Sequence, residues 1–364
     1  MKRFPILLLL VVCTGMTVFA QIDLQQVAIV RLTKSEPITV RQLKTELEKL
    51  AWQSLVERLK RVPTTAELNR EVQNSSTETR RQVLDVIINE RLALQAAERD
   101  RITVTDNELN QHLTQLRASM AQTIGRTPTE EEFAQAIKNE TGQDLPAFRD
   151  TMRRQAIVQK YLLNKKQDQF TSISPPSEAE IVSFYNLSKA QFVRPDTVRF
   201  SMIQVSYGPD ATSKSRAKEL IDRLYRDIGS NPAKFDEAVV NGQSPNSGYR
   251  AGDGGYLPRN LLAQQTAGAE FVNTAFSLRQ GEVSKVIEGV PGYQIIKITE
   301  THSQKALELD DIAELGTRMT VRQYIGANLT QQRQNEVLAR ATQELVRELR
   351  TGNPFQIMEN NLNF

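Results

Sequence analysis

The spacing of apolar residues changes twice along this chain, and that change limits the fold more than any single motif does. Apolar residues recur at helical spacing through most of the first half. Between residues 197 and 300 the pattern becomes strand, helix, glycine-rich loop and strand, and helical spacing returns over 309–349. The sequence therefore predicts an α+β multidomain protein in which one mixed unit interrupts a mainly helical assembly.

Length and composition agree with several folded domains and exclude some classes of protein. A chain of 364 residues exceeds one typical core, and its 39% hydrophobic and 24% charged residues exclude a multi-span membrane protein and argue against general disorder. The 46 basic and 43 acidic side chains nearly balance, whereas nucleic-acid binding needs a concentrated basic face. The sequence has no glycine-rich phosphate loop ending in Lys and Ser or Thr. We therefore expect no nucleic acid, no ATP, no cofactor and no metal ion.

Residues 1–20 have the three-part layout of a secretory signal. Two basic residues precede a short apolar run, and small or weakly polar residues lead to Ala20, after which we expect cleavage. The apolar run is too short to span a bilayer. Cys13 is the only cysteine, so the mature chain would form no disulfide. Lipidation of Cys13 would give a membrane tether, but Val12 is a poor residue before such a cleavage point, and the sequence favours an untethered chain.

Several helices are predicted from hydroxyl residues that are followed three positions later by glutamate, the pattern of a capping box. These pairs are Thr105–Glu108, Thr129–Glu132 and Ser177–Glu180, and residues 75–78 (SSTE) are interpreted in the same way. The three glutamates at 130–132 then favour the positive end of a helix rather than a metal ion. Prolines at 175, 176 and 195 interrupt the helical pattern, and the last marks a domain boundary. Whether residues 51–75 form an extra helix or a loop stays open.

Two short strand patterns lie near the two ends of the chain. Residues 27–32 (VAIVRL) are rich in β-branched side chains, and residues 355–358 (FQIM) lie close to the last residue. Neither segment can be stable alone, because an isolated strand leaves its backbone donors and acceptors unpaired. We predict that the two segments pair and so join the ends of the chain.

The mixed unit resembles a known domain family. Its segments 252–257 (GDGGYL), 281–284 (GEVS) and 292–298 (GYQIIKI), with Phe271 between the first two, resemble in order and spacing the parvulin (rotamase, PpiC-type) peptidyl-prolyl isomerase domain. The flanking helical regions resemble the chaperone module of the periplasmic folding factors SurA, PrsA and PpiD. This weaker likeness rests on an Ile-Thr pair after a strand and on residues 81–90 in a helix.

The resemblance implies four regions and a periplasmic location. They are a signal peptide at 1–20, a helical SurA-like N-terminal chaperone module at 21–195, a parvulin-like domain at 196–301, and a C-terminal helix and tail at 302–364 that pack on the N-terminal module. The implied partners are unfolded or extended client polypeptides. Four aromatic residues could contact clients, although ordinary core packing is the favoured reading for them: Trp52, Phe133, Phe148 and Tyr161.

Prolyl isomerisation needs few reactive groups, because rotation about the X-Pro amide makes and breaks no bond to another atom. Its barrier of about 18–20 kcal/mol comes from lost amide resonance. An apolar pocket for the pyrrolidine ring, and dipoles that favour the twisted amide, are enough to help. By the resemblance, Leu257, Phe271 and one of Leu261 or Leu262 line that pocket as substrate-binding residues.

The sequence departs from the parvulin pattern at the positions of its site. The two family histidines, in the first and last strands, are replaced by Met202 and Gln294, and the family's third polar group falls near Ser244. The chain's two histidines, His112 and His302, cannot be placed in this site from the sequence. Efficient isomerase, weak residual activity and a non-catalytic peptide-binding domain therefore all stay open, and the last is favoured.

The most economical reading is an exported periplasmic folding factor that binds unfolded client polypeptides and whose isomerase activity is weak or lost. An active parvulin-type isomerase is the first alternative. A surface adhesin or scaffold that reuses the fold is the second. Asp253, which lies between glycines, is read as a turn-stabilising residue rather than as part of a phosphate or metal loop.

Overall fold

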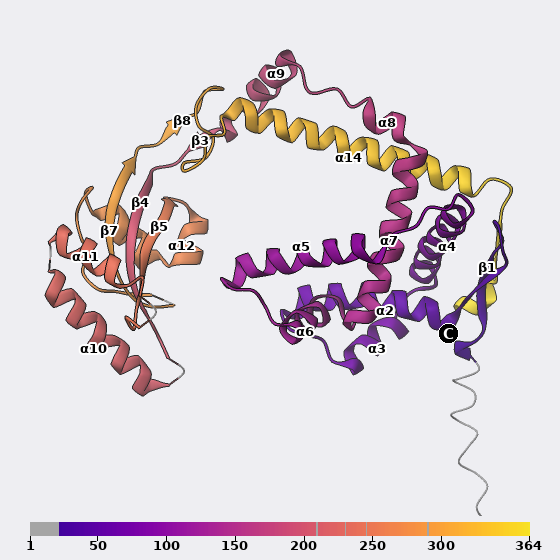
Figure 1. Ribbon diagram of the computed structural model, residues 1–364, viewed down its shortest axis with the longest axis horizontal. Helices are drawn as coiled ribbons and strands as arrows, with labels where there is room; N and C mark the ends of the chain where they lie inside the picture. Colours follow the sequence, from indigo (N-terminus) through magenta and orange to yellow (C-terminus); the bar gives the residue numbers. More distant parts are fainter. Residues whose placement is uncertain (1–21, 209, 230, 245, 290) are drawn as a thin grey trace, which may run out of the picture. The chain divides into compact units, whose positions relative to one another are not determined.

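The computed structural model describes residues 22–364 except 209, 230, 245 and 290, and it divides the chain into two compact units (Figure 1). Unit 1 comprises Met1–Ile173 and Gln334–Phe364, and unit 2 comprises Ser174–Arg333. The predicted signal peptide, with Cys13 and Ala20, lies outside the described residues. Within the described part of the chain, no helix has the length and apolar character needed to cross a membrane.

Unit 1 contains a strand pair and a series of helices, followed by elements from the far end of the chain. In chain order they are β1 (Gln26–Val30), β2 (Glu36–Thr39), α2 (Val40–Leu59), α3 (Thr65–Gln73), α4 (Thr77–Arg99), α5 (Asp106–Ile124), α6 (Glu130–Thr141), α7 (Leu145–Lys165), α8 (Gln167–Thr171), the later part of α14 (Val321–Leu349), β9 (Phe355–Ile357) and η2 (Glu359–Leu362). Residues 51–75, left open by the sequence, are the end of α2, a short connection and α3.

The predicted helix starts are confirmed, with one difference. Reciprocal capping boxes open α5 at Thr105, α6 at Thr129, and α9 (Glu178–Ser188) at Ser177. At the start of α4 the cap is Ser76, whose hydroxyl accepts the N–H of Thr79, and no reciprocal bond is made. The predicted box over 75–78 is therefore wrong in detail, because the residue three positions after the cap is a threonine rather than a glutamate.

The predicted pairing of the chain ends is confirmed. Strand β1 lies between β2 and β9 in a three-stranded antiparallel sheet, in which Ala28 pairs with Ile357 and Val30 with Phe355. The backbone N–H of Met358 also donates to the carbonyl of Val27 at 2.9 Å. Each marginal strand thus gains a partner that supplies its missing hydrogen bonds.

A buried arginine fastens the segment after β9. Arg80 of α4 is 5% exposed, and its guanidinium donates to the carbonyls of Leu362 (2.8 Å) and Gln73 (3.0 Å) and to the hydroxyl of Ser75 (3.0 Å). The same group lies 4.3 Å from the ring centroid of Phe364. Because a buried charge is tolerated only when its donors are used, Arg80 ties the end of the chain to the start of α4.

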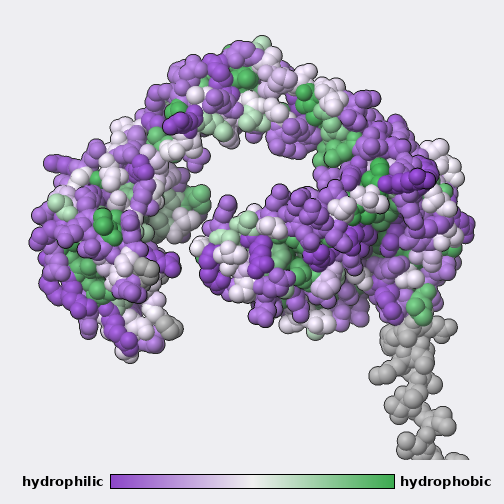
Figure 2. All heavy atoms as spheres, viewed as in Figure 1, coloured by the Kyte–Doolittle hydropathy of each residue, from purple (hydrophilic) through white to green (hydrophobic). Residues whose placement is uncertain are grey.

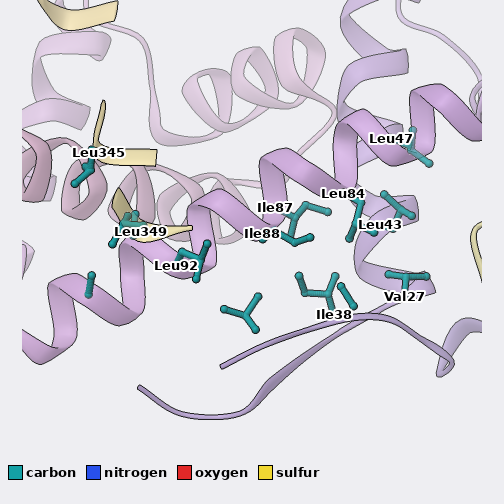
Figure 3. Packing of buried hydrophobic residues seen from close by; sticks show 14 of the residues in the cluster. Val27, Ile38, Leu43, Leu47, Leu84, Ile87, Ile88, Leu92, Leu345 and Leu349 are labelled. Atoms are coloured by element: carbon teal, nitrogen blue, oxygen red, sulfur yellow. The ribbon is translucent and has the colours of Figure 1, made fainter. Parts of the chain in front are cut away.

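The core of unit 1 is built from both ends of the sequence (Figure 3). Its apolar side chains come from the strand pair, α2, α4 and the end of α14, and they include Val27, Ile38, Leu43, Leu47, Leu84, Ile87, Ile88, Leu92, Leu345 and Leu349. A smaller cluster joins α5, α6 and α7. Phe133 and Tyr161 are buried in these cores, which confirms the core reading for both residues. Trp52 is half-buried, and its indole N–H donates to the carbonyl of Asn139 at 3.0 Å.

Unit 2 holds a four-stranded antiparallel sheet in the order β5-β4-β7-β6. Helices α10 and α11 cover one face and α12 and α13 the other (Figure 1). The elements are α9, η1 (Lys189–Gln191), β3 (Val193–Arg194), β4 (Thr197–Ser206), α10 (Ala211–Ile228), α11 (Pro232–Asn241), β5 (Arg250–Pro258), α12 (Leu261–Ala267), α13 (Ala269–Ser277), β6 (Ile287–Gly289), β7 (Gly292–His302), β8 (Lys305–Ala306) and the first part of α14. The α+β multidomain class is thus confirmed.

A separate small core lies beside this sheet domain within unit 2. It joins α9 to the start of α14 through Ile181, Tyr185, Val321 and Ile325, and the Tyr185 hydroxyl donates to the carbonyl of Leu307 at 2.9 Å. Residues 174–195 and 302–333 therefore belong to the same compact unit as the predicted parvulin-like domain.

The predicted helical spacing from residue 309 is wrong for its first turns, because α14 begins only at Val321. Residues 309–320 form an irregular loop in which the Asp311 carboxylate accepts the backbone N–H of Glu308 at 2.7 Å. Gly316 within this loop has a φ of 85°, a left-handed conformation that favours glycine. Local side-chain capping and a left-handed glycine therefore override the apolar spacing here.

Replacing Arg80 should destabilise unit 1. Arg80→Met removes three hydrogen bonds from a buried guanidinium, one of them to the buried carbonyl of Leu362, and we expect a loss of about 2–4 kcal/mol in the free energy of unfolding, measured by urea denaturation. The control is Arg70→Met at an exposed position of α3, where the change should stay within about 0.5 kcal/mol. Equal effects of the two substitutions would contradict the role assigned to Arg80.

Candidate functional site

The strand register brings two of the predicted site residues together. Met202 of β4 is directly opposite Ile296 of β7, and Gln294 lies two residues from Ile296 along the same strand. Side chains alternate between the faces of a sheet, so Met202 and Gln294 share one face as diagonal neighbours, with their Cα atoms roughly 7–8 Å apart. This is the face covered by α12 and α13, since Ile296 belongs to that core.

The sheet face that carries Met202 is packed with aromatic rings at one end, but it is not covered next to Met202 itself. At the packed end, the rings of Phe200 and Phe271 meet edge to face with centroids 5.3 Å apart, and both residues are buried. Met202 is half-buried. Gly252 of β5 lies directly opposite Met202, and a side-chain carbon added at Gly252 would meet nothing within 4 Å. We use the name hollow only for this open position above Gly252 and next to Met202, where no atom lies within 4 Å of the added carbon.

Gly254 shows the opposite situation on the same strand. A carbon added there would lie 2.2 Å from the ring of Phe200, so only a glycine lets β5 lie against that ring. The glycine-rich motif therefore does two different things: Gly254 permits close packing, whereas Gly252 leaves the hollow unfilled.

Gln294 of β7 lies on the side of Met202 that is opposite to Gly252 of β5. It is 6% exposed and lies directly opposite Ile287 of β6. Among the described residues its side-chain carbonyl, Oε1, finds no hydrogen-bond partner. A carbon added at Gly289 would lie 3.1 Å from this oxygen, so the amide rests against the edge strand where that strand has no side chain.

The other predicted residues differ sharply in exposure. Leu257 and Phe271 are buried in the core beneath the sheet, whereas Leu261 and Leu262 at the start of α12 are 68% and 66% exposed. Such exposed apolar side chains form small separate patches on a largely hydrophilic surface (Figure 2). Ser244 is exposed in the turn after α11, a helix that packs on the opposite face of the sheet.

An ion network across three strands was not anticipated from the sequence. Arg199 of β4 pairs with Asp253 of β5 (2.6 Å) and with Glu300 of β7 (2.9 Å). The Tyr256 hydroxyl donates to Glu300 at 2.9 Å, and His302 Nε2 lies 3.0 Å from the same carboxylate. Arg199 first, then His302 and Tyr256, hold the pKa of Glu300 at about 2. His302 is therefore engaged with this network, which only the strand register could have revealed.

Two acidic motifs have structural roles that the sequence indicated. Asp253 accepts the backbone N–H of Gly255 at 3.0 Å, which confirms its turn-stabilising role. Glu132 accepts the backbone N–H of Thr129 at 2.8 Å as the return half of a capping box. Within the described ranges, no three His, Cys, Asp or Glu side chains are grouped in a way that could hold a metal ion.

Unit 1 carries two surface grooves along α5. One, of about 430 Å³, lies between α5 and α6, where Met120, Ile124 and Ala136 are its apolar lining. Its polar rim includes Arg126, which donates to Glu132 at 2.8 Å, so these two charges neutralise each other. The other groove, of about 310 Å³, lies between α5 and α7 and includes His112 in its lining.

Two family models match this chain, one in each half of the sequence. A model of the SurA-like N-terminal domain matches residues 4–162, and a model of the PPIC-type PPIase domain matches residues 176–314. The chain belongs to the SurA/PrsA-type chaperone and foldase family. The resemblance seen in the sequence is therefore confirmed for both domains.

Individual members of this family are distant relatives. The chaperone SurA of Chromohalobacter salexigens is 26% identical over 269 residues, which cover 73% of this chain and 57% of that protein. The foldase PrsA of Clostridium botulinum (strain Loch Maree) is 23% identical over 286 residues, covering 78% and 75%. The chain spans about half the length of the curated SurA relatives it matches.

Solved structures of the family are also similar to this chain. A structure of SurA-like chaperones from Campylobacter jejuni matches with a TM-score of 0.37 and 13% identity, covering 92% of this chain and all of that one. The structure of PrsA from Bacillus subtilis matches with a TM-score of 0.25 and 18% identity, covering 89% and 92%. The domain assignment rests on the family models and on the topology described above.

The two glycines of β5 give a matched test of the site geometry. Gly254→Ala forces a methyl group into the Phe200 ring and should cost about 1–3 kcal/mol of unfolding free energy in unit 2. Gly252→Ala adds the same group to the open hollow and should change stability by no more than about 0.5 kcal/mol. Thermal or urea unfolding measures both, and a costly Gly252→Ala would show that the hollow is filled.

Proposed function

We propose that this protein is an exported, periplasmic folding factor that binds unfolded client polypeptides. In this proposal unit 1 holds the client, and the parvulin-like domain at 196–301 binds prolyl segments with weak or no isomerase activity. Membership of the SurA/PrsA-type family supports the first part. The replacement of both family histidines by Met202 and Gln294 supports the second. The proposed signal peptide at 1–20 supplies the route of export, without a tether through Cys13.

The weak or lost activity follows from what the replacements can do chemically. A methionine thioether carries no exchangeable proton, and a glutamine amide does not change charge between pH 5 and 8 as histidine does. The apolar cluster against which Met202 packs, with Phe200, Phe271 and Ile296, supports the proposal that a pyrrolidine ring can still be received beside Met202. Binding of a proline ring therefore survives in this proposal, while stabilisation of the twisted amide is reduced.

Client binding in unit 1 is proposed to use the groove between α5 and α6. Its apolar lining, Met120, Ile124 and Ala136, would bury an aliphatic or aromatic client side chain and gain about 25 cal/mol for each square ångström removed from water. Because the rim charges Arg126 and Glu132 pair with each other, the groove offers no unpaired charge to select a charged side chain. With no nucleotide-binding loop in the sequence, binding and release would be passive.

The groove predicts a specific loss of chaperone function. Ile124→Asp places a charge where an apolar client side chain would lie, and we expect binding of an unfolded outer-membrane protein to weaken tenfold or more, since one buried apolar side chain contributes about 1.5–3 kcal/mol. Suppression of client aggregation, followed by light scattering, is the measurement. Leu338→Asp on α14 is the control, because Ile124 and Leu338 are both 42% exposed. Equal loss in both variants would reject the groove.

The exposed leucines of α12 predict a loss of prolyl-peptide binding. Leu262→Ser should weaken binding of a proline-containing peptide, whereas Val240→Ser on α11, at a position that is also 66% exposed, should not. Peptide affinity is measured by fluorescence anisotropy, and isomerase turnover by a protease-coupled assay with the same variants. We expect turnover close to the uncatalysed rate. Robust turnover that falls in Leu262→Ser alone would instead favour an active parvulin-type isomerase.

A further inference from the structure

The side-chain carbonyl of Gln294 is buried without a hydrogen bond. The residue is 6% exposed, and in the part of the chain that is described its Oε1 has no donor within reach. A neighbouring buried polar group is fully used: Ser284 Oγ accepts the N–H of Ile296 at 2.9 Å and donates to the carbonyl of Lys285 at 2.6 Å. An unpaired buried carbonyl lowers the stability of the fold. A role in binding would explain why this position carries one.

The surroundings of this carbonyl select the kind of donor that could reach it. Gln294 shares its face with Met202, Ile296 and Ile287 and with Gln204 directly opposite on β4, and none of these side chains is charged. The amide of Gln204 donates to the hydroxyl of Ser206 at 3.3 Å rather than to Gln294. A lysine or arginine brought here would lose its water without gaining a counter-charge. A neutral backbone N–H carries a much smaller desolvation cost, and the amide of Gln294 breaks no hydrogen bond at Oε1 when it turns to meet one.

We infer that Gln294 Oε1 accepts a hydrogen bond from a backbone N–H of a bound prolyl segment. This inference rests on the proposed peptide-binding function, and it names the group of the ligand that the protein recognises. Proline itself has no N–H. With its ring in the hollow beside Met202, the nearest backbone donors are those of the residues before and after it. Gln294 is thus a specificity-determining residue that favours an extended neutral peptide next to proline.

The test combines one substitution with one chemical change in the ligand. The peptide Ala-Ala-Pro-Phe, blocked at both ends, is titrated into the full chain by calorimetry or NMR. Two further copies carry an N-methyl group on the residue before or after the proline. Gln294→Met removes the acceptor and keeps an unbranched side chain of similar length. The control is Gln280→Met, whose amide donates to the carbonyl of Thr299 outside this site.

Loss of one hydrogen bond should weaken binding about threefold to tenfold. We expect this loss in Gln294→Met, the same loss for one of the two N-methylated peptides on the unchanged protein, and no further loss when the two changes are combined. The midpoint of thermal unfolding should also rise by about 2–6 °C in Gln294→Met, because a buried unpaired carbonyl is removed. Gln280→Met should leave peptide binding unchanged and should not raise the midpoint of thermal unfolding, because it removes a hydrogen bond that is made.

Two other results would overturn the inference in different ways. If the unmodified peptide binds and neither Gln294→Met nor N-methylation weakens it, the carbonyl has no role in binding, and the proposed peptide site stands without it. If the unmodified peptide does not bind at all, both the inference and the proposed function of this domain fail. The comparison of methylated and unmethylated peptides on the unchanged protein decides the matter even if Gln294→Met does not fold.

Discussion

The core of unit 1 depends on residues that lie far apart in the sequence, on both sides of unit 2. Leu345 and Leu349 of α14 complete the apolar cluster around α4, and β9 supplies the hydrogen-bond partner that β1 lacks on its outer side. Arg80 then fixes the segment that follows β9. Residues 174–333 are therefore an insertion between two parts of one folding unit, and the proposed client-holding module cannot complete its core until the residues that follow the insertion have been synthesised.

In unit 2, a single strand register sets both the network of charges and the candidate peptide site. The pairing of β4 with β5 and β7 places Arg199 between Asp253 and Glu300, and three residues further along it places Met202 between Gly252 and Ile296. The first set is closed by ion pairs, and the second is left open. The proposal that isomerase activity is weak or lost rests on two positions of this site, Met202 and Gln294, whose side chains do not change charge between pH 5 and 8.

Much of this arrangement could be predicted from local sequence signals, and the reason is physical. Capping boxes such as Thr105–Glu108 act over three residues and need no tertiary context. Pairing of the terminal strands followed from the instability of each alone. The apolar spacing alone gives the wrong structure for the loop at 309–320, because local signals override it: the Asp311 carboxylate bonded to the backbone of Glu308 and the left-handed Gly316. The burial of Phe271 and the exposure of Leu261 could not be predicted, because they depend on which side of α12 and α13 meets the sheet.

The central claim is that the parvulin-like domain binds prolyl peptides without catalysing their cis/trans isomerisation. Two-dimensional exchange NMR on a cis/trans prolyl peptide, with the methionine methyl groups of the protein labelled, measures both properties in one sample. We predict that the Met202 methyl resonance shifts as peptide is added, while the exchange rate between the cis and trans peptide signals stays at its uncatalysed value. A large increase in that rate, or an unchanged Met202 resonance at saturating peptide, would contradict the account.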